Sequence, residues 1–393
     1  MFRNYSPDAE YHCSPKTSSK GFTKLMYLVV NQKVMMKKVL RKLKSEINKK
    51  NELGWTALLI ACRNSNSKSS IETVKLLLNS GAQLDIQNND GWTALMMAAS
   101  YSNNDSNIET VKLLLDHGAK IDIKDNNGLT ALMMAAKYCN NDSNFEIIEI
   151  LLKYGANPNH KNNNGWSALM LAADKSNNYS NIKTVKLLLD HGADLNIQEN
   201  NGQTALMLVT EYNAKDCNIE IIKLFLGNGA KVNLKNNNGW TALMLATRYD
   251  GIASNIEAMK LLLNYGANVD LQNNYGWTAL MVATGYNRYI DIDHNIETIK
   301  LLLKHGAKTD IRDNNGWTPL MMVARYSNSG SNIETIKLLL EHSTNINIQN
   351  NNGKTALKLA TITHKNSDII KLFLNYGAKK KDIIESLLLI TAK

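Results

Sequence analysis

The 393-residue chain has few cysteines, few prolines and no long apolar run. Its four cysteines, Cys13, Cys62, Cys139 and Cys217, show no paired spacing, which argues against a disulfide framework or a zinc site. No stretch approaches the roughly 18 apolar residues of a membrane span, and the N-terminus lacks the apolar segment of a secretory signal. We therefore expect an intracellular protein of the cytosol or nucleus, neither secreted nor transmembrane.

Motifs of common catalytic and cofactor sites are also missing. The glycines are isolated rather than grouped in a phosphate-binding loop, and the serines have no evident His and Asp partners. We therefore expect no enzyme activity, no cofactor and no metal.

The net charge of +10 is concentrated at one end of the chain. Residues 1–50 contain twelve Lys/Arg and three Asp/Glu, so they carry +9 of it. Within this segment lie the basic residues Lys37, Lys38, Arg41, Lys42 and Lys44. Such a cluster is typical of a nucleic-acid or anionic-membrane contact, or of a nuclear localisation signal. The alternative is the solvated face of a capping helix, and no interleaved aromatic residues support base stacking.

What the chain does have is repetition. The motif Gly91-Trp92-Thr93-Ala94-Leu95-Met96 recurs along the sequence at the glycines Gly54, Gly91, Gly128, Gly165, Gly202, Gly239, Gly276, Gly316 and Gly353. The spacing is 37 residues at every step except the one from Gly276 to Gly316, which is 40. A second motif, Leu-Leu-Leu followed by Gly-Ala, runs in step with the first. A fixed period of this size predicts a solenoid whose units bury their apolar faces against one another.

One repeat can be interpreted in detail. The predicted order is a turn at 88–91, a helix from Ala94 to about Tyr101 capped by Thr93, a polar loop at 102–106, a second helix capped by Asn107 and ended by Gly118, and an extended arm through Ile121 and Ile123.

The histidines His117, His191, His305 and His342 precede the glycine that ends the second helix, or its serine substitute. Equivalent positions of stacked helices lie roughly 10 Å apart. That is too far to share a zinc ion, so we expect these histidines at helix C-termini.

This layout, with Gly-x-Thr-x-Leu and Leu-Leu-Leu-x-x-Gly-Ala in register, resembles the ankyrin repeat over residues 21 to about 380. The resemblance implies an all-α ankyrin-repeat solenoid of paired antiparallel helices with short β-hairpin-like turns. The family's Thr-Pro-Leu-His tetrapeptide is here Thr-Ala-Leu-Met, and only Thr318-Pro319-Leu320-Met321 keeps the proline. The period exceeds the family's usual length by four residues, placed between the two helices. The Asn-rich turns are similar in style to ankyrin proteins of amoeba-infecting giant DNA viruses of the mimivirus type.

We divide the chain at the repeat boundaries. The predicted parts are a disordered arm at 1–20, a degenerate, basic N-capping repeat at 21–50, repeats at 51–87, 88–124, 125–161, 162–198, 199–235, 236–272, 273–312, 313–349 and 350–382, and a C-terminal capping helix at 383–393.

Two aromatic rows are the candidate binding residues. The first follows the turn glycine and comprises Trp55, Trp92, Trp166, Trp240, Trp277 and Trp317. The second ends the first helix and comprises Tyr101, Tyr138, Tyr212, Tyr249, Tyr286 and Tyr326. The resemblance implies that both positions face the groove where partners bind, and Trp and Tyr are enriched at interface hot spots. The alternative is that each Trp packs over a neighbouring turn. If the rows bind a partner, its selection would depend on residues that interrupt or adjoin them, namely Leu129, Gln203, Asp174, Lys175, Glu211 and Arg248.

The resulting expectation is a monomeric, non-catalytic scaffold for protein–protein interaction, with a host protein as partner if the viral resemblance holds. One alternative is a nucleic-acid- or membrane-associated protein that uses residues 33–50. Another is a substrate adaptor for a ubiquitin ligase, although no F-box-like segment is recognisable at 1–20 or 380–393.

Overall fold

The computed structural model describes residues 21–30, 37–64, 68–100, 105–137, 142–174, 179–212, 219–248, 253–285, 295–326, 330–343, 345–363 and 367–383; at several helix ends only the backbone is described. The predicted disordered arm at 1–20 and residues 384–393 of the predicted capping helix lie outside this part. The chain forms two compact units, Met1–Asn163 and Asn164–Lys393.

All regular secondary structure in the described ranges is helical. The first unit contains α1 (Lys24–Val30), α2 (Lys37–Lys42), the 3-10 turn η1 (Lys44–Glu46), α3 (Ala57–Arg63), α4 (Lys68–Asn79), α5 (Ala94–Ser100), α6 (Asp105–Asp116), α7 (Ala131–Lys137) and α8 (Asp142–Lys153). The second contains α9 (Ala168–Asp174), α10 (Tyr179–Asp190), α11 (Ala205–Tyr212), α12 (Ile219–Gly227), α13 (Ala242–Arg248), α14 (Ala253–Asn264), α15 (Ala279–Gly285), α16 (Asn295–Lys304), α17 (Pro319–Tyr326), α18 (Gly330–His342), α19 (Ala356–Thr363) and α20 (Ser367–Asn375).

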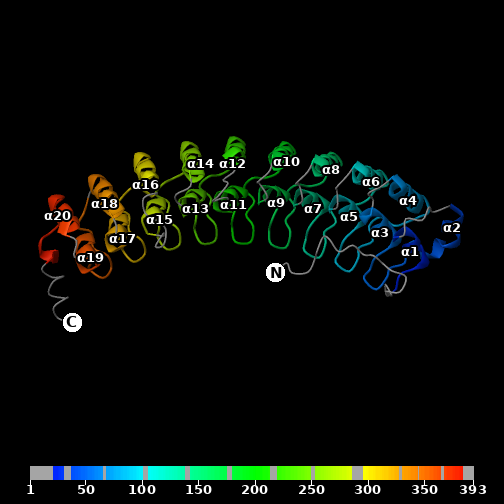
Figure 1. The fold of residues 1–393 in the computed structure, drawn as a ribbon, viewed down its shortest axis with the longest axis horizontal. Helices are drawn as coiled ribbons and strands as arrows, with labels where there is room; N and C mark the ends of the chain where they lie inside the picture. The colour runs from blue at the N-terminus through cyan, green and yellow to red at the C-terminus, as the bar shows by residue number, and fades with distance from the viewer. Residues whose placement is uncertain are drawn as a thin grey trace. The chain divides into compact units, whose positions relative to one another are not determined.

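Within each unit the helices form two layers, which can be followed in Figure 1. In the second unit, α11, α13, α15, α17 and α19 pack side by side in one layer, and α12, α14, α16, α18 and α20 in the other. Each helix of the first layer also packs on the helix that follows it, which gives the helix pair predicted from the period. The core between the layers consists mainly of the Ala-Leu-Met side chains of the first layer and the leucines of the second.

The first helix of each repeat begins where the sequence predicts. The Thr93 hydroxyl accepts the backbone N–H of Met96 at 3.3 Å, and Thr278 does the same for Met281. Such a cap satisfies one of the donors that a helix N-terminus leaves unpaired. These short helices of seven or eight residues are stable through burial rather than propensity, since Ala94 to Ala99 are all at most 2% exposed.

The second helix ends as predicted but begins earlier. Gly118 has φ +86°, and the N–H groups of Gly118 and Ala119 bond to the carbonyls of Leu115 and Leu114. This double bond pattern is a Schellman cap, in which a residue without a Cβ adopts the left-handed conformation at little cost. The prediction that Asn107 is the N-cap is wrong, because α6 already includes Asp105 and Ser106.

The extended arm predicted after the second helix is also not a strand. Ile121 and Asp122 form a turn, and the described connections between repeats contain only turns and irregular backbone. The Asp122 carboxylate instead accepts the N–H of Asn157 in the next repeat, at 3.3 and 3.4 Å from its two oxygens. The alternation of apolar and polar residues is not matched by alternating burial, since Ile121, Asp122 and Ile123 are all of intermediate burial.

An asparagine ladder joins successive turns. In the second unit, Asn274 donates its backbone N–H to the carbonyl of Asn238 at 3.1 Å and its side-chain amide to that of Asn237 at 2.9 Å. The same side-chain amide bond, one repeat back, is made by Asn237 and Asn314 in this unit and by Asn126 and Asn163 in the other. The asparagine-rich turns thus have a structural role that their conformational tolerance alone does not explain.

Candidate functional site

The turn that precedes the first helix fixes the backbone of each tryptophan. The Asn236 side-chain oxygen accepts the N–H groups of Asn238 and Trp240, and the Asn236 N–H donates to the Trp240 carbonyl at 2.9 Å. Asn273 and Trp277 repeat the arrangement one unit later. Because both backbone groups of these two Trp residues are bonded within the turn, their Cα atoms take the same position in the two repeats.

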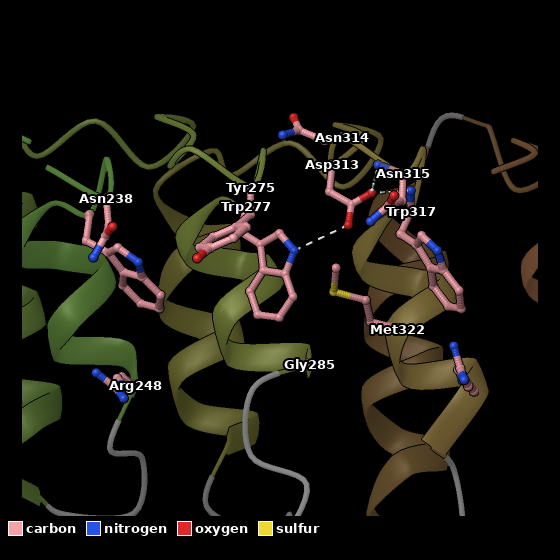
Figure 2. Close-up of a pocket in the computed structure, with 12 residues that line it drawn as sticks. Asn238, Arg248, Tyr275, Trp277, Gly285, Asp313, Asn314, Asn315, Trp317 and Met322 are labelled. Atoms are coloured by element: carbon pink, nitrogen blue, oxygen red, sulfur yellow. Dashed lines mark hydrogen bonds between the residues drawn. The ribbon is translucent and has the colours of Figure 1, made fainter. Parts of the chain in front are cut away.

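The predicted tryptophan row is half-buried rather than fully exposed. Trp240 is 9% exposed, and Trp55, Trp92, Trp166, Trp277 and Trp317 are of intermediate burial. Trp55 and Trp92 lie in the first unit and the other four in the second. The indole N–H of Trp277 donates to the Asp313 carboxylate of the next turn at 3.3 Å, as Figure 2 shows. Trp277 therefore has a packing role and retains accessible surface, whereas Trp240 is almost completely buried.

The sequence analysis selected Asp174, Glu211 and Arg248 but did not identify the column to which they belong, eight positions after the Trp position of each repeat. The guanidinium carbons of Arg63, Arg248 and Arg325 lie 5.5, 5.8 and 5.2 Å from the ring centroids of Trp55, Trp240 and Trp317. These distances are those of cation–π contacts. Aligning the repeats on the turn glycine would have revealed this column. It reads Arg63, Ser100, Lys137, Asp174, Glu211, Arg248, Gly285, Arg325 and Ile362. We call it the variable column.

Three of the residues singled out from the sequence come together in the second unit. Gln203, which takes the Trp position of its repeat, donates to the Glu211 carboxylate, and Arg248 donates to the same carboxylate at 3.3 Å. The Arg248 and Glu211 side chains are 29% and 16% exposed, so the pair is partly desolvated. Of the others, Leu129 is half-buried and Asp174 exposed, and neither is part of this network; Lys175 lies outside the described residues.

A pocket of about 830 Å³ opens between three repeats of the second unit. Trp240, Trp277 and Trp317 line it, with Arg248 and Arg325 from the variable column. In Figure 2, the Met322 side chain lies between Trp277 and Trp317, and Gly285 marks the end of α15. At Gly285 the variable column has no side chain, and a Cβ there would approach Met322 Sδ to 2.8 Å.

The second predicted row lies outside what the structure describes. Tyr101, Tyr138, Tyr249 and Tyr286 fall in ranges that are not described, and Tyr212 and Tyr326 end α11 and α17 without a described side chain. Tyr275 is an exposed aromatic residue that the sequence analysis did not select. It is 62% exposed at the tip of the turn that carries Trp277, and it also lines the pocket.

The repeated histidines cap helices, as predicted. Nδ1 of His117, His191, His305 and His342 lies 2.8 to 2.9 Å from the carbonyl oxygen four residues earlier. The described residues contain no cluster of His, Cys, Asp and Glu suited to a metal ion. Burial raises the pKa of the Cys62 thiol far above its ordinary value, so this residue is a core side chain rather than a nucleophile.

Asp125 is a charged residue at a position where most repeats have asparagine. One carboxylate oxygen accepts the N–H groups of Asn127 and Leu129, while Oδ2 is buried without a hydrogen-bond partner. Burial is the main reason that the pKa of Asp125 is raised above its ordinary value, although the bonds to Leu129 and Asn127 act in the opposite direction.

We predict that Asp125→Asn stabilises the first unit by about 1 kcal/mol at pH 7, because it removes a buried negative charge. A folded-state pKa above the unfolded value means that the wild type loses stability as pH rises from about 4, the ordinary Asp pKa, through the folded-state pKa. The gain should therefore shrink at pH 4 and be complete at neutral pH. Urea unfolding at both pH values measures it, and an equal or larger gain at pH 4 would contradict this explanation.

The basic segment is exposed where it is described. Arg41, Lys42 and Lys44 lie on the surface of α2 and η1, and the side chains of Lys37 and Lys38 are not described. Lys50 donates to the Gln87 carbonyl of the next repeat at 2.8 Å, so this lysine contributes to packing between repeats. None of the described helices is long and apolar enough to cross a bilayer.

Comparison with known proteins agrees with this architecture. The family model "Ankyrin repeats (3 copies)" matches residues 25–125, 66–162, 138–218, 212–292 and 289–383. Two ankyrin-repeat proteins of Acanthamoeba polyphaga mimivirus are 42% identical over 91 residues and 45% identical over 89 residues. These matches cover 20% and 21% of this chain, and 14% and 16% of those proteins.

Among solved structures, the ankyrin repeat domain of Bcl-3 superposes with a TM-score of 0.51 at 24% identity, which shows a shared fold. The match covers 62% of this chain and 99% of that domain. Ankyrin repeats are in general non-enzymatic modules that bind other proteins. The helix pairs, the capped turns and the family match over most of the sequence show that this chain belongs to the ankyrin-repeat family.

Proposed function

We propose that the chain is a non-catalytic scaffold that binds a protein partner through the tryptophan row of the second unit. The observation that carries the proposal is the combination of a constant and a variable column. Trp240 and Trp277 are held by the same backbone bonds, and Trp166 and Trp317 take the same position of their repeats, whereas the residue eight positions after these four tryptophans is Asp, Arg, Gly and Arg in turn. A constant aromatic platform supplies contact area, and the variable residues supply selectivity.

A packing role for the tryptophans is compatible with a binding role. Trp277 bonds to Asp313 of the following turn, and Arg248 and Arg325 lie over Trp rings of their own repeats. These contacts order the side chains before a partner arrives, which lowers the entropy lost on binding. A rigid, half-buried Trp is therefore compatible with both roles.

The mimivirus relatives motivate the finer proposal that the partner is a protein of an amoebal host. Sequestration or recruitment of that protein would follow from binding alone. The ubiquitin-ligase adaptor remains a proposal without a described structural element, since residues 1–20 and 384–393 are outside the described part.

Affinity capture from amoeba lysate tests the proposal. We expect the double variant Trp277→Ala, Trp317→Ala to lose the proteins that the wild type retains, because two central aromatic anchors are removed. The matched control is Lys300→Ala, Lys337→Ala, which changes exposed residues of α16 and α18 in the same repeats. Equal capture by both variants, with circular dichroism unchanged, would refute binding through the tryptophan row.

The basic segment provides the second candidate, because Arg41, Lys42 and Lys44 are exposed. Binding to nucleic acid or anionic lipid through these residues would weaken steeply with salt, since it depends on counterion release. Capture through the tryptophan row should change little between 50 and ~300 mM salt, given that its contacts are mainly apolar. A salt titration of the captured proteins separates the two.

A further inference from the structure

Seven Asn-Gly sequences occur in the chain, and the last of them differs from the others in its surroundings. The seventh is Asn352-Gly353 in the last turn, and the sixth type of site, Asn228-Gly229, directly follows α12. In such a sequence the glycine nitrogen can attack the asparagine side chain, because glycine has no Cβ to obstruct its approach. The other five lie in turns on which the turn of a further repeat packs, namely at Asn127, Asn164, Asn201, Asn238 and Asn315.

In these five inner turns the Asn-Gly peptide group is held by the next repeat. Each of the five asparagine carbonyls accepts the backbone N–H of an asparagine of the next repeat at 2.9 to 3.1 Å, and the glycine that follows it is buried. In the turn of Asn238, the Gly239 N–H also donates to the Asn236 carbonyl at 2.8 Å. Rotating this peptide group to bring the glycine nitrogen to the side chain would break both hydrogen bonds and displace the next turn.

The last turn lacks this cover within the described part of the chain. No described backbone N–H donates to the Asn352 carbonyl, and both Asn352 and Gly353 are exposed. A Cβ at Gly353 would meet nothing within 4 Å. The remaining restraint on the peptide group is the Gly353 N–H, which donates to the Asn350 carbonyl at 2.9 Å. Rotation here therefore breaks one hydrogen bond rather than two, and no packed turn has to move.

Asn228-Gly229 is also exposed, but its side chain is tethered. The Asn228 amide nitrogen donates to the Leu224 carbonyl at 2.8 Å, and the Gly229 N–H donates to the Leu226 carbonyl at 3.1 Å. Reaction at this site would break both bonds and with them the cap of α12. The Asn352 side chain, in contrast, makes no hydrogen bond to the described residues.

We propose that Asn352 is a site of spontaneous deamidation in the folded protein, and that the fold protects the other six Asn-Gly sequences. The Gly353 nitrogen attacks Cγ of Asn352, and the new C–N bond closes a five-membered succinimide as the bond from Cγ to Nδ2 breaks. The leaving amide takes up the proton of the Gly353 N–H and departs as ammonia. Water then opens the ring at either carbonyl, which gives aspartate or isoaspartate.

The modification changes the segment that leads into the last helix pair. Both products carry a negative charge, and isoaspartate also lengthens the backbone by one methylene. Thr355 follows three residues later; its hydroxyl accepts the N–H of Lys358 at the start of α19 and donates to the buried Asp382 carboxylate at 2.7 Å. The product therefore differs from the original chain in charge and backbone length directly before the cap of α19.

Incubation of the full chain at mildly alkaline pH, followed by peptide mapping with mass spectrometry, tests the proposal. We expect product at Asn352 to accumulate roughly tenfold faster or more than at any other Asn-Gly site, since rotation elsewhere breaks an additional hydrogen bond and disturbs packed groups. The same chain unfolded in urea is the reference. There all seven sites have glycine as the next residue and no fold to restrain them, so they should react at similar rates.

Asn352→Gln is the matched control, because glutamine would have to close a six-membered ring. Its peptide, which also contains Asn350 and Asn351, should remain unmodified while the other six sites behave as in the wild type. Equal rates at Asn352 and Asn238 in the folded chain would overturn the proposal, as would an Asn352 that reacts only in urea. A product that persists in Asn352→Gln would assign the reaction to Asn350 or Asn351 and would overturn it as well.

Discussion

Replacing Gly239 with alanine is expected to destabilise the second unit by about 3 kcal/mol, whereas Gly229→Ala costs about 1 kcal/mol. Both glycines have positive φ, +78° and +86°. A Cβ at Gly229 would meet nothing within 4 Å, so only the backbone conformation opposes it. A Cβ at Gly239 would lie 2.7 Å from the backbone nitrogen of Asn274 and 2.9 Å from the Cα of Asn273.

The difference arises because the turn glycine is where the next repeat makes its closest approach. Asn274 donates to the carbonyls of Asn237 and Asn238, and its own backbone nitrogen and side-chain oxygen lie where a Cβ at Gly239 would have to fit. Alanine would thus disturb the asparagine ladder as well as the turn. Urea unfolding of the two variants, followed by tryptophan fluorescence, measures the contrast. Equal losses of unfolding free energy in the two variants would mean that neighbouring turns can move apart at little cost. The asparagine ladder would then not restrict the residue at position 239.

Replacing Phe225 with alanine should cost 3–5 kcal/mol, the usual range for a buried Phe. Phe225 is fully buried in α12, and the equivalent residues of the adjacent repeats, Leu188 and Leu262, are fully buried as well. Phe225→Leu installs the residue that the neighbours use, so it should cost no more than about 1.5 kcal/mol.

Hydrogen exchange of α12 and α14 provides the measurement, because the loss should be concentrated in the helices that contact the cavity. A similar loss of protection for the alanine and leucine variants would show that the site is adapted to Phe alone. Loss of protection spread evenly over the second unit would contradict the nearest-neighbour character expected of stacked repeats.

Most of the fold could be predicted from the sequence, because the determinants are local and occur many times. Thr93 as a cap and Gly118 as the residue ending the second helix both follow from residue chemistry at fixed spacing. The start of α6 at Asp105 was missed, because Asn107 is a good cap and nothing in its neighbourhood shows that an earlier residue already begins the helix. The asparagine ladder was also missed, since its bonds join residues 37 positions apart.

The candidate site, like the fold, could be predicted from the sequence only in part. The tryptophan row and the candidate residues Gln203, Glu211 and Arg248 were selected from the sequence repeats. That these three residues form one network, and that Arg248 lies over Trp240, depends on contacts between helices. The pocket could not be predicted, because it is lined by residues of three repeats and depends on how their side chains pack.

Photo-crosslinking in amoeba lysate tests the central claim most directly, that the tryptophan row of the second unit is the binding surface. p-Benzoylphenylalanine would replace Tyr275, which is 62% exposed beside the pocket, or Lys300, which is exposed on α16 in the other layer. We predict adducts with a defined set of proteins from position 275 and none from position 300. Those adducts should disappear when Trp277→Ala and Trp317→Ala are added. Adducts from position 300 alone, or adducts from position 275 that survive the loss of both tryptophans, would contradict the claim.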